Sequence, residues 1–287
     1  MKILVIGSRG SAHGIVRKLA QSKEVTEICV TPGSDAMQLI RLVSNEEPVG
    51  RMDLLEVNNA KKVVEYAFSG SYDLVVPIHE SCLETGLGDM CRKCGIPFAG
   101  PCRRGANFEL SKTYTQEFSE RHKLPIATGR VHQTIGGARD YALKLLKGFG
   151  GCVVKADGSA RGKGVYVCRS YADVGESIQE IMKERRFGDS GNAVVIQELL
   201  TGHERSLHYL CDATVQIPLP ISVDYKRLLD GDKGPQTGGM GCYTAPSHNY
   251  GLITVANDSI VGPWHVGCQD EELLYRGILY PGIMIVA

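Results

Sequence analysis

The first third of the chain alternates short apolar runs with amphipathic segments, and this alternation limits the possible folds more than any other feature. The runs KILVIG, EICV and DLVVPI, at residues 2–7, 27–30 and 73–78, each end in a turn or a polar bend. Strands that alternate with helices favour a parallel sheet covered by helices, with ligands beyond the carboxyl ends of the strands. We therefore predict an α/β protein whose N-terminal domain, residues 1–110, holds a doubly wound parallel sheet.

The pattern changes after a helical segment from about Ser111 to Arg121. From about Val131 onwards, strand-like segments such as CVVKAD, GVYVC and AVVIQELL flank glycine loops, and one amphipathic helix covers about Asp173 to Arg185. Elements in this order are typical of an α+β region. We predict that such a region follows the first domain, without internal repeats.

The balanced charge and the scattered cysteines narrow the class of protein. Lys and Arg together number 32, as do Asp and Glu, so no overall field favours nucleic acid or an anionic membrane surface. No apolar run approaches the ~20 residues that span a bilayer. The ten cysteines follow no disulfide framework and fit reduced thiols. We expect a cytoplasmic protein that acts on small molecules and binds neither nucleic acid nor membrane.

The turn after the first apolar run, GSRG at residues 7–10, lacks the full G-x-G-x-x-G pattern of a dinucleotide site. The second run ends in Thr-Pro at residues 31–32, where such a site needs an acid for the ribose. We therefore expect no NAD or FAD. Gly10 fits either a tight turn or a phosphate site at the start of the next helix. His13 fits either a polar helix-start residue or a substrate contact.

The segment VVKADGSARGKGV, residues 153–165, places Lys155 in an apolar strand before a glycine loop that carries two further cations. A Walker A loop would lead into a helix, but this loop returns into the strand GVYVC, so we predict a β-hairpin lid. The backbone N–H groups of such a loop, together with Lys163, can close over a polyphosphate. A lysine buried in a strand without an anion would be costly, which favours a phosphate ligand.

Two later segments have the character of ligand loops. In QELLTGHE, residues 197–204, an apolar strand ends in a polar bend and an acid follows, which suits an adenine slot with a carboxylate for the ribose hydroxyls. The loop GPQTGGMG, residues 234–241, has four glycines among eight residues. Its backbone can visit positive φ and approach a ligand closely.

Together, SK at residues 111–112, VVKADGSARGKGV, QELLTGHERS and DYKRLLDGDKGPQTGGMG resemble the ATP-grasp enzymes. Among these, the chain is most similar to the phosphoribosylamine–glycine ligase (glycinamide ribonucleotide synthetase) family, from Met1 to about Met284. The resemblance implies ligation of glycine to phosphoribosylamine through a glycyl phosphate, with ATP and Mg²⁺. It also implies a lid subdomain over residues 111–200 and an incomplete ATP-grasp core over residues 201–287.

The resemblance implies roles for individual positions. The positions that match nucleotide-binding residues are Lys112, Lys155, Asp157, Gly158, Gly162, Lys163, Gly164, Glu198, Leu200 and Glu204. The positions that match catalytic residues are Asp224, Lys226 and Arg227. The positions that match substrate-binding residues are Gly10, His13, Glu80, Gly234, Pro235, Thr237, Gly238, Gly239, Met240 and Gly241. The glycine loop is then a cradle whose backbone amides face phosphate or carboxylate.

Departures from the family's pattern bear on activity. RGSAH at residues 9–13 stands where the family has Gly-Gly-Arg-Glu-His, and Gln197 stands where it usually has Glu. The chain stops at Ala287, before the family's Glu and Asn ligands to Mg²⁺, so the metal ligands are unknown. We expect this chain alone to bind ATP weakly and to make little or no product. Two alternatives stay open: a non-catalytic or impaired nucleotide- or phosphosugar-binding protein, and an ATP-grasp ligase for another amine.

We predict that Lys155→Ala weakens nucleotide binding by more than about 1.4 kcal/mol, a tenfold change, because a charge-assisted contact is lost. Calorimetric titration of the variant with ATP measures this change. An unchanged affinity would contradict the placement of Lys155 in the nucleotide site.

Overall fold

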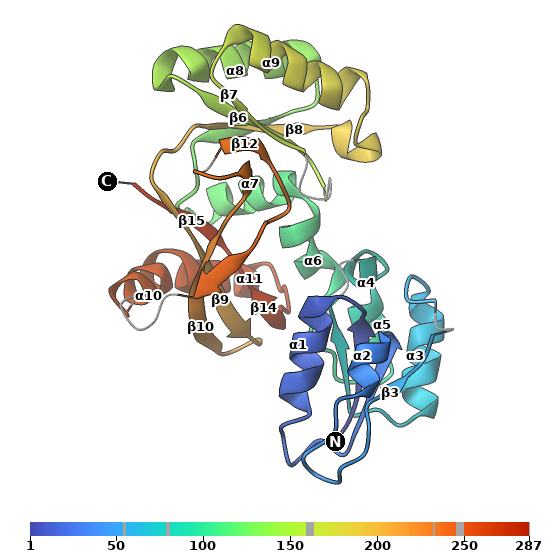
Figure 1. The fold of residues 1–287 in the computed structure, drawn as a ribbon. Coiled ribbons are helices and arrows are strands. Elements are labelled where there is room, and N and C mark those ends of the chain that lie inside the picture. Colours follow the sequence, from blue (N-terminus) through green and yellow to red (C-terminus); the bar gives the residue numbers. More distant parts are fainter. Residues whose placement is uncertain (54–55, 79–80, 159–163, 232, 245–249, 287) are drawn as a thin grey trace. The chain divides into compact units, whose positions relative to one another are not determined.

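A computed structural model describes residues 1–53, 56–78, 81–158, 164–231, 233–244 and 250–286. The chain divides into two compact units (Figure 1). One unit holds Met1–Ala106 with Leu273–Gly277, and the other holds Asn107–Glu272 with Ile278–Ala287. All ten cysteines are free thiols. Within the described ranges, no helix combines the length and the apolar character needed to cross a bilayer. The subdomain boundaries at residues 110 and 200 stay predictions.

The first unit is built on a parallel sheet with the strand order β3-β2-β1-β4. Ile3 and Val5 of β1 pack in one apolar cluster, whereas Leu4 and Ile6 pack in another. Both faces of the sheet are therefore buried, as in parallel sheets that helices cover on two sides. This confirms the predicted doubly wound α/β fold. The strands are β1 (Lys2–Gly7), β2 (Glu27–Pro32), β3 (Gly50–Arg51) and β4 (Leu74–Pro77).

The helices of this unit follow the strands in sequence and supply the covering layers. In α1, Ala12 and Val16 lie one turn apart and are both buried. The start of α3 is capped by Asn59, whose side chain accepts a hydrogen bond from the Lys62 N–H. The helices are α1 (Gly10–Leu19), α2 (Asp35–Gln38), α3 (Ala60–Ser69), α4 (Ser81–Glu84), α5 (Leu87–Lys93) and α6 (Arg103–Leu110), the last of which continues into the second unit.

The second unit contains an antiparallel sheet with the strand order β5-β8-β6-β7. Alternate residues of β6, namely Cys152, Val154 and Ala156, are buried in an apolar cluster. The helices α8 and α9 cover this face of the sheet (Figure 1). Lys155 therefore lies on the opposite face. The pairing of β6 with β7 agrees with the predicted hairpin. The elements are β5 (Gly129–His132), α8 (Ile135–Phe149), β6 (Cys152–Ala156), β7 (Val165–Cys168), α9 (Tyr171–Ile178) and β8 (Val194–Glu198).

The helix expected from about Asp173 to Arg185 is α9 together with a π-helical turn at Gln179–Lys183. α9 begins at Tyr171, before the expected start at about Asp173, because Ser170 and Asp173 form a capping box. In this box each side chain accepts a hydrogen bond from the other residue's backbone N–H. A 3-10 turn at Gly188–Gly191 then leads to β8.

A second sheet of this unit is centred on β9, which pairs with β10, β14 and β15, while β13 pairs with β10. β11 and β12 follow β10 in the sequence and form a separate hairpin. The strands are β9 (His203–Cys211), β10 (Gln216–Asp224), β11 (Arg227–Leu229), β12 (Lys233–Gln236), β13 (Cys242–Thr244), β14 (Gly277–Leu279) and β15 (Gly282–Ile285). The helical elements are α10 (Tyr250–Ala256), a π-helical turn (Asn257–Val261) and α11 (Gly262–Asp270).

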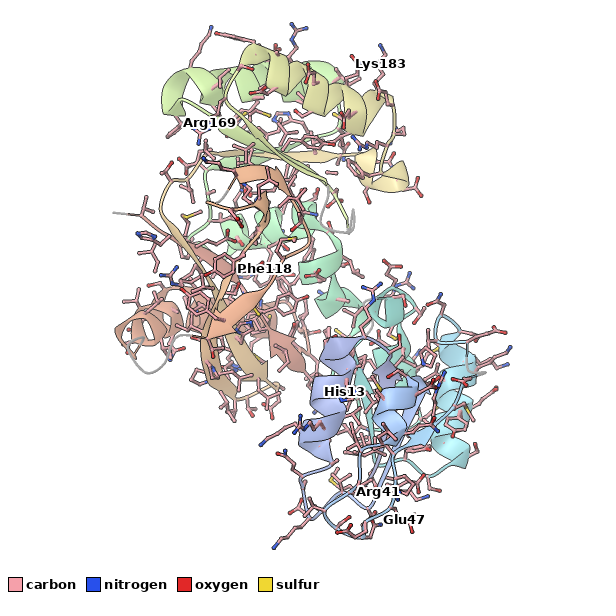
Figure 2. All side chains as sticks on the ribbon, viewed as in Figure 1. His13, Arg41, Glu47, Phe118, Arg169 and Lys183 are labelled. Carbon is pink, nitrogen blue, oxygen red and sulfur yellow. The ribbon has the colours of Figure 1, made fainter. Side chains whose placement is uncertain are left out.

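An aromatic cluster anchors α7 (Lys112–Arg121) in the second unit. Phe118 (Figure 2) is fully buried, and its ring centre lies 4.7 Å from that of Phe108 in an edge-on arrangement. Phe108 in turn contacts Trp264 of α11, with ring centres 5.7 Å apart. Such pairs add to the stability gained from burial. The observed helix agrees with the one expected from about residue 111 to residue 121.

We predict that Phe118→Ala lowers the free energy of unfolding by about 3–5 kcal/mol, because it leaves a cavity in this cluster. Phe149→Ala is the matched control: Phe149 is 54% exposed at the end of α8, and its loss should change stability by less than about 0.5 kcal/mol. Urea denaturation of both variants measures the difference. Equal losses would show that the cluster does not anchor α7.

Candidate active site

Lys155 lies on the face of the β5-β8-β6-β7 sheet that α8 and α9 leave uncovered. Its ammonium donates a hydrogen bond to the Gln197 amide oxygen of β8 at 2.5 Å. Desolvation, together with repulsion by Lys112 and Lys226, lowers the pKa of Lys155 to about 8, against the attraction of Glu204. Two other lysines from separate parts of the unit therefore act on this ammonium.

Lys112 begins α7 and reaches the start of the hairpin loop. Its ammonium donates a hydrogen bond to the Gly158 carbonyl at 2.5 Å. Burial lowers the pKa of Lys112, while the carboxylates of Asp157 and Glu109 oppose that shift. Lys112 is thus a second partly desolvated cation on the same unit as Lys155.

Asp157, expected to contact ATP, has a structural role at the start of α7. Its Oδ1 accepts hydrogen bonds from the Ser111 hydroxyl at 3.1 Å and from the Thr113 N–H at 3.0 Å. Ser111 in turn caps the helix by accepting from the Tyr114 N–H. The carboxylate near the helix N-terminus is also favoured by the helix dipole. Asp157 therefore ties the end of β6 to α7 and fixes where Lys112 stands.

Gly158 and Gly164 flank the part of the hairpin loop that lies outside the described residues. Gly158 has φ +75°, and a Cβ there would lie 2.5 Å from the Ser190 hydroxyl, so only glycine fits. The Gly164 carbonyl accepts from the Ala156 N–H at 2.8 Å, which closes the hairpin. Gly162 and Lys163 fall within residues 159–163, outside the described ranges, so their roles stay predictions.

The segment after β8 begins with a carboxylate that is already engaged. Glu198 Oε1 accepts a hydrogen bond from the Thr128 N–H at 2.8 Å, and the Glu198 N–H donates to the Thr128 carbonyl. Leu200 follows in the bend and is half-buried. Glu204, in β9, forms an ion pair with Lys226. Glu204 is therefore paired with a cation of the site, although more than a third of its side chain stays exposed.

The glycine loop folds back on the end of β10. The Thr237 N–H and hydroxyl both donate to the Lys226 carbonyl, at 2.7 and 2.9 Å, and the Met240 N–H donates to the Tyr225 carbonyl. Gly239 has φ +111°, and a Cβ there would lie 3.2 Å from Asp224 Oδ1. Asp224 thus faces the loop, and glycine is required where the backbone passes it.

Other loop residues support this arrangement. Arg227 donates from Nη1 to the Gly234 carbonyl at 2.8 Å, across the β11–β12 hairpin, and Gly234 has φ +80°. The Tyr225 N–H donates to the Gly241 carbonyl at 2.9 Å. Pro235 belongs to β12, while Gly238 and Met240 are exposed. The structure thus brings the expected catalytic residues and the glycine loop together.

The expected residues of the first unit lie at the start of α1. Gly10 is its first residue, and the half-buried His13 (Figure 2) lines a groove of about 410 Å³ with Arg17 and Arg41. Glu80 lies outside the described residues.

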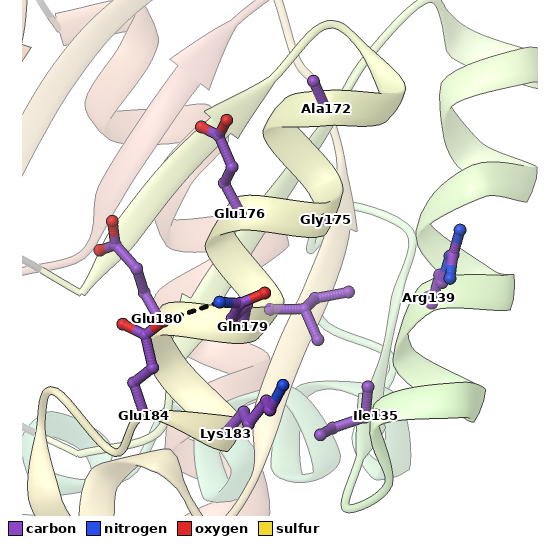
Figure 3. Close-up of a pocket in the computed structure, with 10 residues that line it drawn as sticks. Ile135, Arg139, Ala172, Gly175, Glu176, Gln179, Glu180, Lys183 and Glu184 are labelled. Carbon is purple, nitrogen blue, oxygen red and sulfur yellow. Dashed lines mark hydrogen bonds between the residues drawn. The ribbon is translucent and has the colours of Figure 1, made fainter.

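A larger groove, of about 600 Å³, lies between α8 and α9 and carries Arg139, Lys183 and three glutamates (Figure 3). Lys155 lines neither groove. In the described ranges, no three His, Cys, Asp or Glu side chains gather as a metal site, and we assign no metal ligand.

Comparison with known proteins decides the family. The model for "Phosphoribosylglycinamide synthetase, N domain" matches residues 1–109, and that for "Phosphoribosylglycinamide synthetase, ATP-grasp (A) domain" matches residues 110–287. The chain belongs to the phosphoribosylglycinamide synthetase family. The resemblance inferred from the motifs is therefore confirmed.

Individual relatives of this synthetase-family chain agree. Phosphoribosylamine–glycine ligase of Streptococcus pneumoniae serotype 4 is 36% identical over 292 residues, covering 100% of this chain and 66% of the relative. The human trifunctional purine biosynthetic protein adenosine-3 is 35% identical over 285 residues, covering 99% of this chain and 27% of that protein. The chain thus spans just under two thirds of the ligase and about a quarter of the trifunctional protein.

Solved structures show the same fold. The crystal structure of phosphoribosylamine–glycine ligase from Thermotoga maritima has a TM-score of 0.76 and 26% identity, covering 100% of this chain and 66% of that one. The biotin carboxylase domain of Hydrogenobacter thermophilus 2-oxoglutarate carboxylase, in complex with MgADP, has a TM-score of 0.69 at 14% identity, covering 99% of this chain and 61% of that one. The second likeness is one of fold alone.

One residue near Lys155 in this synthetase-family chain could not be predicted from the sequence. Gln116 of α7 is buried, and its amide oxygen accepts a hydrogen bond from Gln197 Nε2 at 2.7 Å. A single glutamine in an amphipathic helix carries no signal of such a partner, because 81 residues separate the two.

We predict that the low pKa of Lys155 makes its contribution to stability depend on pH. The folded-state pKa of about 8 lies below the ordinary value of 10.5, so the folded state binds fewer protons between these values. The stability of the native protein should therefore rise, relative to Lys155→Met, by about 2 kcal/mol between about pH 7.5 and about pH 9.5. Parallel stability curves from urea denaturation would show that Lys155 is not desolvated. Neither Met nor Arg titrates in this range, so Lys155→Arg should show the same dependence of stability on pH as Lys155→Met.

Proposed function

We propose that this chain joins glycine to the amine of 5-phosphoribosylamine, using ATP, to give glycinamide ribonucleotide, ADP and phosphate. Membership of the phosphoribosylglycinamide synthetase family supports the reaction class. The observation that carries the proposal is that the desolvated Lys155 ammonium, held by the uncharged Gln197 amide, is repelled by both Lys112 and Lys226. A polyphosphate would offset both the cost of desolvating Lys155 and the repulsion from the other two lysines, because it supplies several negative charges to the same place.

ATP would place its phosphates against Lys112 and Lys155, beneath the β6–β7 hairpin. The MgADP bound by the Hydrogenobacter thermophilus protein of the same fold supports a nucleotide ligand. The segment from Glu198 through Leu200 to Glu204 would take the adenosine. Because Glu198 is held by the Thr128 backbone, we assign it to shaping the bend, and we assign the ribose hydroxyls to Glu204.

These cations and the glycine loop would support a reaction in two steps. A carboxylate oxygen of glycine attacks the γ-phosphorus, the bond to the bridging oxygen breaks, and ADP leaves. The amine of phosphoribosylamine then attacks the carbonyl carbon of glycyl phosphate, phosphate leaves, and the amine loses a proton. Lys112 and Lys155 spread the charge of the transferring phosphoryl group. Magnesium bound to the phosphates would add to this charge stabilisation, and we derive no step through it.

The substrates would be held by the end of β10 and the loop that folds onto it. Lys226 and Arg227 supply positive charge for carboxylate or phosphate, and Asp224 can accept a hydrogen bond from an amine. The loop contributes backbone N–H groups between Thr237 and Gly241. Gly10 and His13 of the first unit, and Glu80, which lies outside the described residues, stay predicted substrate contacts.

The test is ADP release that requires both glycine and phosphoribosylamine. It is measured with this chain and with the chain joined to the remaining third of the Streptococcus pneumoniae ligase. Release that disappears when either substrate is omitted supports the proposal. ATP binding without such release in both forms would favour a non-catalytic nucleotide-binding protein. Release that depends on a different amine would favour a ligase for that amine.

We predict that Lys226→Met lowers kcat in whichever form is active by about 10²-fold, because a cation facing developing charge is lost. Lys233→Met is the matched control, since Lys233 is exposed on the same hairpin region and should leave kcat unchanged. Similar kcat values for the two variants would remove Lys226 from the catalytic set.

A further inference from the structure

Gln197 is the residue that holds the Lys155 ammonium in place. It lies in β8, directly beside β6 in the sheet, and only 7% of its surface is exposed. Its amide oxygen accepts from Lys155 Nζ at 2.5 Å, and its amide nitrogen donates to Gln116 Oε1 at 2.7 Å. Both ends of the Gln197 amide therefore have a partner.

The direction of this hydrogen-bonded chain follows from chemistry. An ammonium can only donate, so Gln197 must turn its oxygen towards Lys155 and its NH₂ group towards Gln116. Gln116 then accepts with its oxygen, and its own NH₂ group donates to Glu120 Oε1 at 2.7 Å. All the donors point from Lys155 towards Glu120. The negative charge of this hydrogen-bonded series lies at its far end, on the exposed Glu120 carboxylate.

Lys155 consequently has a neutral hydrogen-bond acceptor rather than a carboxylate partner. The charged groups that act on it are Lys112 from α7, Lys226 after β10 and Glu204 from β9. Two of these three are cations, and Glu204 is itself paired with Lys226. Within the described residues, the hydrogen bond that Lys155 makes is to the uncharged Gln197 amide.

We propose that Gln197 is a positioning residue that orients the Lys155 ammonium without neutralising it, so that ligand phosphate completes the charge of the site and its binding is accompanied by proton uptake at Lys155. This inference rests on the proposed nucleotide binding. A carboxylate at the same position would orient Lys155 equally well but would neutralise it before the ligand arrives. The Lys155 pKa of about 8 supports the proposal, because at a pH near this value part of the Lys155 population is neutral in the free protein.

The decisive variant is Gln197→Glu, which keeps the size of the side chain and adds a negative charge. The pKa of Lys155 should rise by about 1–3 in this variant, because an opposite charge at hydrogen-bond distance favours the ammonium. ¹³Cε NMR titration of lysine-labelled protein measures this pKa without any nucleotide, and Lys155→Arg assigns the signal. Gln133→Glu, the same change at an exposed position after β5, should leave the Lys155 signal unchanged. Melting curves confirm that each variant is folded.

Proton uptake is measured by calorimetric titration with a non-hydrolysable ATP analogue at about pH 8, in two buffers that differ in ionisation enthalpy. The native protein should take up about half a proton more per bound nucleotide than either Gln197→Glu or Lys155→Arg. Equal uptake in the native protein and both variants, with nucleotide still bound, would overturn this inference and leave the proposed function standing. A Lys155 pKa near its ordinary value in the native protein would also overturn it. Absence of nucleotide binding by the native protein would overturn both.

Discussion

The candidate site depends on the cost of holding the Lys155 ammonium away from water. The sheet places Lys155 on the face opposite the apolar cluster of α8 and α9, where Gln197 orients it. Lys112 and Lys226 come from other elements and repel it. Like charges gathered in a desolvated place are unfavourable without an anion. This one constraint links the β5-β8-β6-β7 sheet, α7 and the end of β10 to the proposed phosphate binding.

Hydrogen bonds to the backbone keep these elements in register. Asp157 bridges the end of β6 and the first turn of α7 through Ser111 and Thr113. Thr237 holds the glycine loop against the Lys226 carbonyl. Asp157 lies in a segment that resembles a nucleotide-binding motif and Thr237 in one that resembles a substrate-binding motif, and both make hydrogen bonds within the protein. Residues in such motifs therefore have a structural role in building the site.

Much of this architecture could be predicted from local pattern. The apolar runs at residues 2–7 and 27–30 became parallel strands buried on both faces, and the segment with Lys155 became one strand of an antiparallel hairpin. Contacts between distant residues could not be predicted in the same way. The pairing of Gln116 with Gln197 and of Glu204 with Lys226 joins separate elements, and neither side chain of a pair has a sequence signature for the other.

The family, the alternation of strands and helices in the first unit, and the positions of the two glycine loops all follow from local sequence. Periodicity and glycine content carry these properties because they act over a few neighbouring residues. Two features depend on packing: Asp157 accepts a hydrogen bond from the first turn of α7, and Lys155 is held by a neutral amide while two lysines repel it. A pKa and a hydrogen-bond partner depend on burial and on charges brought from distant parts of the chain, which packing alone supplies.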